Sequence, residues 1–191
     1  MVARSTNPSW CPTETSVIAL PRAILPSSDV MHAAMASIEQ HALPKRRQIM
    51  CFNLKFRPGD GRAEAIEALE RNGFNCTRSA GRLAFGDFFR EMHASQFVLS
   101  PWGHGVNNHR EWEALAAGSI PVMQRYAPNA DMYKDLPVVF VDNWETVTPA
   151  FLDGEWNRIA KLNAAKCTSL SRAYLPYWLG RLTQFMQPGE G

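Results

Sequence analysis

The amino-acid sequence predicts an α/β fold: a parallel sheet of about four or five strands flanked by helices, forming a single Rossmann-like lobe. Short apolar runs rich in β-branched residues alternate along the chain with amphipathic segments at helical spacing. Strands and helices that alternate in this way require right-handed crossovers, which place the helices against the sheet. A glycine-containing loop also joins one apolar run, residues 97–99, to the helical segment behind it. In open α/β sheets such a loop is a common place for a ligand.

Composition places the chain among ordinary globular proteins. It has 191 residues, of which 46% are hydrophobic, which suffices for one domain with a substantial core and argues against disorder. The net charge of +2 is too small to indicate a nucleic-acid partner. No apolar stretch approaches the roughly 20 residues of a membrane span, and the first residues lack the apolar core of a signal peptide. We therefore expect a soluble chain without a membrane span.

The cysteines do not indicate a metal site. Cys11, Cys51, Cys76 and Cys167 lack the paired, closely spaced pattern of zinc ligands, so we expect free buried thiols and no metal. Residues 75–77 read Asn-Cys-Thr, a glycosylation sequon that has meaning only if the chain reaches a secretory lumen.

The first part of the chain has one convincing strand. Residues 1–28 carry four prolines and little periodicity, which predicts an irregular lead-in or linker. A helix is expected over roughly 30–42, capped by Asp29. The apolar run 49–52 is the first strand. Three basic residues at 45–47 precede it; a solvated strand entrance explains them better than nucleic-acid binding does.

A loop and a helix follow this strand. The loop, residues 53–61, falls where a parallel sheet places ligand groups. The helix is expected over 60–72 and ends at Gly73, and residues 74–76 are a candidate short strand. Arg62 falls in the first turn of the helix, where the dipole does not favour a cation. It is either an ordinary exposed arginine or a group kept for contact with phosphate or acceptor.

The middle of the chain alternates helix and strand. Residues 85–94 form an amphipathic pattern that should pack its phenylalanines and Met92 on the sheet. Residues 97–99 and 120–123 are the next two strands, and Gly118 ends the helix between them.

The loop before that helix is a predicted anion site. Gly103 and Gly105 permit a tight turn with unobstructed N–H groups, and Asn107 or Asn108 can cap the helix. Free N–H groups and the helix dipole then point toward the same place, where a phosphate would bind. His104, in this loop, is a candidate substrate contact.

The helix presents two informative faces. Trp112 and Leu115 share a face that should pack inward, while Arg110 and Glu113 share a face with small side chains. Arg110 could hold a diphosphate by its planar fork, and Glu113 could accept hydrogen bonds from sugar hydroxyls. Spacing alone favours the simpler alternative, an ordinary surface ion pair. His109, in the first turn, could donate to a phosphate or hold the loop; two histidines without an acidic partner do not indicate a metal.

The C-terminal part adds one strand and two helical regions. Residues 126–135 are expected to be a loop with a short helical turn, and 138–141 a buried strand. Asp142 and Trp144 follow that strand at its carboxyl end. A helical region begins near Thr146 or Thr148, and the tail 166–187 has an aromatic stripe more typical of core than of a binding surface; Pro176 should kink it or start a new helix.

One extended motif resembles a known family. The run Ser100-Pro101-x-Gly103-x-Gly105, followed by His109-Arg110-x-Trp112-Glu113-Ala114-Leu115 and Gly118-x-Ile120-Pro121-Val122, resembles the exostosin-like glycosyltransferases, family GT47. The resemblance covers roughly residues 48–152. Trp102 stands where the family has arginine and Asn107 where it has aspartate.

The resemblance implies the C-terminal, donor-binding half of a GT-B fold. The implied function is transfer of a sugar from a UDP-linked nucleotide sugar to a glycan, protein or other hydroxyl acceptor, with inversion and without a metal or other cofactor. The implied catalytic residues are Arg110 and Glu113. The implied substrate-binding residues are Asn53, Arg62, Ser100, Gly103, His104, Gly105, Asn107, His109, Asp142 and Trp144.

A dinucleotide-dependent oxidoreductase is a weaker alternative. Asn108 stands where the third glycine of the GxGxxG fingerprint would be, and the acidic residue expected about 20 positions further on is missing.

The expected organisation is a lead-in, residues 1–28, and a donor-binding domain, residues 29–191, with its core at 48–152 and a helical region at 148–187. Because a GT-B enzyme has two lobes and this chain has room for one, we expect a fragment or a lone donor-binding half that turns over little sugar by itself.

The alternative function is a non-catalytic or truncated nucleotide-sugar-binding module. A missing N-terminal lobe or self-association would complete the site. The implied compartment is the Golgi lumen if an N-terminal anchor is missing, and otherwise the cytoplasm.

Overall fold

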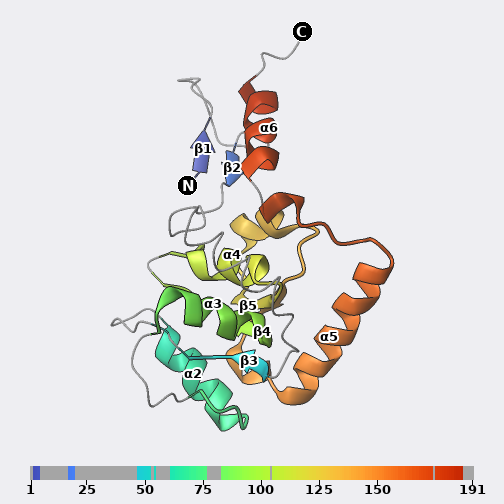
Figure 1. Ribbon diagram of the computed structural model, residues 1–191. Coiled ribbons are helices and arrows are strands. Elements are labelled where there is room, and N and C mark those ends of the chain that lie inside the picture. Colours follow the sequence, from blue (N-terminus) through green and yellow to red (C-terminus); the bar gives the residue numbers. More distant parts are fainter. Residues whose placement is uncertain are drawn as a thin grey trace.

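Four parallel strands form the central sheet of the computed structural model, in the order β3-β4-β5-β6 (Figure 1). The strands are β3 (Arg47–Met50), β4 (Ser95–Leu99), β5 (Ile120–Gln124) and β6 (Val139–Val141). Ile49 lies opposite Phe97, and Val122 lies opposite Val139. This sheet confirms the predicted α/β class and the single Rossmann-like lobe. The structure describes residues 2–4, 17–19, 47–52, 54, 61–76, 83–103, 105–173 and 175–186.

Helices cover both faces of the sheet. They are α2 (Arg62–Arg71), α3 (Phe85–His93), α4 (His109–Ala116), α5 (Pro149–Ala164) and α6 (Leu175–Met186), with the short 3₁₀ turns η2 (Ala127–Tyr133), η3 (Trp144–Thr146) and η4 (Ser171–Ala173). Helices α2 and α5 pack on one face, and α3 and α4 pack on the other. Figure 1 shows α5 running by itself along one side of the sheet, while α3 and α4 lie together.

Alternation along the strands builds the two halves of the core. Ile49 points to the face covered by α2 and α5, whereas the next residue, Met50, points to the face covered by α3. Successive side chains of a strand project to opposite faces, so both faces of these strands are apolar. A third cluster, which includes Trp112, Tyr133 and Trp178, joins α4 to η2 and α6.

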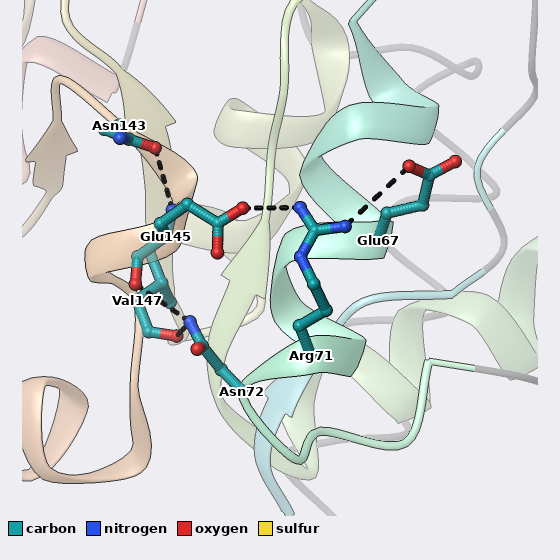
Figure 2. Close-up of polar contacts among 6 residues, drawn as sticks. All are labelled: Glu67, Arg71, Asn72, Asn143, Glu145 and Val147. Carbon is teal, nitrogen blue, oxygen red and sulfur yellow. Dashed lines mark hydrogen bonds and ion pairs between the residues drawn. The ribbon is translucent and has the colours of Figure 1, made fainter.

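Helix α2 is fixed at its C-terminal end to the segment that joins β6 to α5 (Figure 2). The Asn72 side chain donates to the carbonyl oxygens of Glu145 at 3.0 Å and Val147 at 2.9 Å. Arg71 forms an ion pair with the Glu145 carboxylate, and the Asn143 side chain accepts from the Glu145 N–H at 2.9 Å. These contacts hold two parts of the chain together that are about 70 residues apart in sequence.

The predicted ends of several elements are confirmed. Gly73 and Gly118 lie past the ends of α2 and α4 with φ of 90° and 68°, left-handed values that favour glycine. Thr148, one of two candidates, caps α5 by accepting from the Phe151 N–H. Pro176 lies in the first turn of α6, so it starts a new helix.

The predictions for the cysteines and for residues 74–76 are wrong. Cys51 and Cys76 form a disulfide, where we expected free thiols. Cys167 is free but exposed rather than buried. Residues 74–76 form no strand, because the Phe74 N–H bonds back to the Leu69 carbonyl in the closing turn of α2 and Cys76 is tied to Cys51. Cys11 lies outside the described residues.

The lead-in contains a small sheet. β1 (Val2–Arg4) and β2 (Val17–Ala19) pair antiparallel, with Val2 opposite Ala19. We expected irregular backbone there, since two three-residue strands are too short to show periodicity. The rest of residues 1–28 and the helix expected at 30–42 lie outside the described residues. Among the residues that the structure does describe, no helix has the length and apolar character needed to cross a membrane.

Candidate functional site

The carboxyl ends of the four strands lie along one edge of the sheet, because the strands are parallel. Arg110, in the first turn of α4, joins the ends of two strands. Its Nε donates to the Leu99 carbonyl oxygen at the end of β4, and its Nη2 donates to the Phe52 carbonyl oxygen just beyond β3, each at 2.8 Å. The planar guanidinium can donate in two directions at once, so a single side chain fixes the spacing of β3 and β4 at this edge.

Two further contacts continue along the same edge. The rings of Trp102, after β4, and Tyr126, after β5, meet edge to face with centroids 5.9 Å apart. The Arg125 Nε donates to the Asp142 Oδ1 at 3.0 Å, which joins the ends of β5 and β6. Asp142 is 79% exposed, so this pair contributes little to stability. Trp102 thus packs against the neighbouring loop at the position where the GT47 motif has arginine.

The face of α4 that carries Arg110 is covered by protein. Its guanidinium lies 5.4 Å from the centre of the Phe88 ring, and Ala114 and Ala117 are buried against α3. Glu113 is only 8% exposed. Both interpretations of this face are therefore wrong. Glu113 is buried, so Arg110 and Glu113 are not an ordinary surface pair. Helix α3 covers the small side chains that we expected to leave room for a ligand.

Arg110 keeps its charge in this environment. Burial lowers its pKa to about 10, the nearby Glu113 carboxylate opposes that effect, and the nearby Arg62 adds to it. The lowered pKa is still well above neutral, so the edge carries two cations in one region, Arg62 and Arg110.

The Arg62 guanidinium approaches Gly103 so closely that it occupies the place of a side chain there. A Cβ built on Gly103 would lie 2.2 Å from the Arg62 Nη2 and 2.9 Å from the Asn108 Oδ1. Arg62 therefore extends from the first turn of α2 onto the glycine loop before α4. The structure thus brings Arg62 together with Gly103 and Arg110, which belong to a later part of the sequence.

Asn108, rather than Asn107, caps α4. The Asn108 side chain accepts from the backbone N–H of Glu111, and the Glu111 carboxylate accepts from the Asn108 N–H. This reciprocal capping box satisfies two of the N–H groups at the helix start. Asn107 instead accepts from the Trp112 Nε1 at 2.9 Å, which fixes the buried indole.

Glu111 is the residue that sequence reasoning missed. It is 1% exposed, and Tyr133, stacked on Trp112, donates its hydroxyl to the Glu111 Oε1 at 3.1 Å. Among the described residues the other carboxyl oxygen has no hydrogen-bond partner. Burial raises the pKa of Glu111 to about 8, so the protonated, neutral form predominates at neutral pH. The spacing of Asn108 and Glu111, three residues apart, is the signal that could have found it.

The remaining predicted residues divide into two groups. Ser100 is buried and donates to the Val98 carbonyl oxygen at 3.3 Å, and Trp144 is buried in the core against α2 and α5, so both serve the fold. Gly105 and Asp142 lie exposed at the carboxyl edge, and His109 is partly buried in the first turn of α4. Asn53 and His104 lie outside the described residues. Within the described parts of the chain, no group of three or more His, Cys, Asp or Glu residues is placed to hold a metal ion.

The fold and this edge define an open α/β lobe with a basic carboxyl edge. No protein-family model matches the sequence, and no curated protein matches it. The resemblance to exostosin-like glycosyltransferases therefore rests on the sequence motif in residues 100–122 and stays a prediction.

Proposed function

We propose that the chain binds the diphosphate of a nucleotide sugar, UDP-linked, at the carboxyl edge of the sheet. The observation that carries the proposal is the approach of Arg62 to Gly103, beside Arg110 and next to the start of α4. Guanidinium groups and the N–H groups of a glycine loop at a helix start are suited to a diphosphate.

The two arginines have different roles in this proposal. Arg62 lies against the glycine loop and contacts the diphosphate. Arg110 uses two of its donor groups on the carbonyl oxygens of Phe52 and Leu99, so it positions the loop and adds positive potential. The neutral form of Glu111 supports the same assignment, because it places little negative charge beside the bound anion.

The proposed reaction is that of an exostosin-like glycosyltransferase. An acceptor hydroxyl attacks the anomeric carbon from the face opposite the nucleotide and releases its proton to solvent. The bond from that carbon to the diphosphate oxygen breaks, and UDP leaves. Arg62 and Arg110 offset the charge that develops on the diphosphate.

Isothermal titration of the chain with UDP, UDP-sugars and uridine tests this function. We expect Arg62→Gln to weaken UDP binding about tenfold or more, equivalent to about 1.4 kcal/mol, and to leave uridine binding nearly unchanged. Arg158→Gln is the matched control, because Arg158 is a surface arginine of α5 that pairs with Glu155 on its own helix. A folded chain that releases no heat with millimolar UDP would contradict the proposal.

A further inference from the structure

The Cys51–Cys76 disulfide carries information about where the protein matures. Cys51 follows β3 and Cys76 follows α2, with Cα atoms 4.9 Å apart, and both side chains are buried. A Cα separation of this size is in the normal range for a disulfide. Disulfides persist in secretory and extracellular compartments and are rare in the cytosol. The pairing therefore indicates an oxidising compartment.

The residue beside this disulfide is the acceptor of a glycosylation sequon. Asn75 is exposed and lies in irregular backbone after α2. Residues 75–77 read Asn-Cys-Thr, which satisfies the acceptor pattern because the middle residue is not proline. The chain's other Asn-x-Ser/Thr triplet, residues 7–9, has proline in the middle. Residues 75–77 are thus the chain's only acceptor sequon.

We propose that Asn75 carries an N-linked glycan, added in the same oxidising lumen in which Cys51 and Cys76 pair. The Asn75 Nδ2 attacks the anomeric carbon of an oligosaccharide linked to a lipid diphosphate. A carbon–nitrogen bond forms, the bond from that carbon to the diphosphate oxygen breaks, the lipid diphosphate leaves, and the amide loses one proton. The proposal does not depend on the proposed function.

The position of Asn75 suits a glycan. Helix α2 has 10 residues, so its two ends are separated by about 15 Å. Arg62 lies at the end that meets the glycine loop, and Asn75 lies beyond the other end. The contacts of Asn72 with the carbonyl oxygens of Glu145 and Val147 fix the backbone three residues before Asn75 (Figure 2). Asn75 is exposed there, so an attached glycan can extend into solvent.

Peptide mapping of the native protein from its source cells tests the proposal. Trypsin places Cys51 in the peptide 48–55 and Cys76, with Asn75, in the peptide 72–78. Without reduction we expect these two peptides to be linked. Removal of the glycan by peptide-N-glycosidase in H₂¹⁸O should convert Asn75 to ¹⁸O-labelled aspartate. A parallel digest without glycosidase identifies spontaneous deamidation at Asn72-Gly73, which lies in the same peptide.

Variants expressed in the same cells separate the two modifications. Thr77→Ala should lose the glycan and keep the linked peptides, whereas Cys51→Ser should lose the link and keep the glycan, because it leaves the sequon intact. Unlabelled Asn75 in the native protein would overturn the glycan site. Peptides 48–55 and 72–78 that react with iodoacetamide before reduction would overturn the oxidising compartment and with it the proposal.

Discussion

Glu111 combines a capping role with complete burial of its carboxyl group, and this combination makes stability depend on pH. Burial raises its pKa from 4.5 to about 8, and the groups that face it are the Asn108 N–H, the Tyr133 hydroxyl, Arg110 and Glu113. The folded state therefore holds this proton more tightly than the unfolded state does. The contribution of Glu111 to stability is greatest below pH 4.5, falls as the pH rises from 4.5 to 8, and is constant above that.

Replacing Glu111 with glutamine should remove this pH dependence. The amide oxygen can still accept from the Asn108 N–H, and no proton is released at any pH in the range. Urea unfolding between pH 5 and pH 8 should show a steeper loss of stability in the native chain than in Glu111→Gln, by about 1.4 kcal/mol for each pH unit. Glu67→Gln removes an exposed carboxylate and is the control. Equal slopes in the native chain and Glu111→Gln would contradict the assignment.

Arg110 should matter to stability through its geometry rather than through its charge alone. Arg110→Lys keeps a cation but cannot span the carbonyl oxygens of Phe52 and Leu99. We expect the free energy of unfolding to fall by about 3 kcal/mol, since hydrogen bonds from charged groups contribute about 1.5–3 kcal/mol. Urea unfolding measures the change, with Arg158→Lys on the surface of α5 as the control. A midpoint within error of the native one would show that the two contacts do not stabilise the edge.

At the scale of elements, two glycines illustrate opposite effects of an added methyl group. Gly103→Ala should displace Arg62 from the loop, because the new Cβ would lie 2.2 Å from its Nη2. UDP binding should weaken as much as in Arg62→Gln. Gly154→Ala, inside α5 with no atom within 4 Å of the added Cβ, should stabilise the chain by about 0.5–1 kcal/mol through helix propensity and leave UDP binding unchanged.

Thermal unfolding and titration of both variants check this contrast. Unchanged UDP binding in a folded Gly103→Ala chain would mean that Arg62 does not contact the diphosphate.

Most elements could be predicted because the apolar residues of each helix and strand recur at the spacing typical of that element. The amphipathic pattern at residues 85–94 corresponds to α3, and the β-branched run at 138–141 contains β6. The position of α3 against the Arg110 face of α4 could not be predicted, because the periodicity of one helix shows which side is apolar but not what covers it. The strands β1 and β2 were missed because three residues are too few to show alternation.

At the scale of the whole molecule, the parallel sheet made the edge of the candidate site predictable but not its contacts. Parallel strands place Gly103 and Asp142 along the same edge, whatever the side chains do. The approach of Arg62 to Gly103 and the pairing of Cys51 with Cys76 depend on how α2 returns across the sheet. Cysteine spacing alone does not indicate a partner, and nothing local to Arg62 indicates where its guanidinium lies.

The disulfide should stabilise the whole lobe, because it closes the segment that contains α2. Cys51 and Cys76 are 25 residues apart, and a crosslink over a loop of this length stabilises a domain by about 3 kcal/mol, mainly by restricting the unfolded chain. We expect Cys51→Ser/Cys76→Ser to unfold at a clearly lower urea concentration than the native chain under non-reducing conditions. Under reducing conditions the difference should largely disappear. Cys167→Ser is the control, because Cys167 is an exposed, free thiol. Equal midpoints in the absence of reductant would show that the two cysteines are not crosslinked in the folded chain.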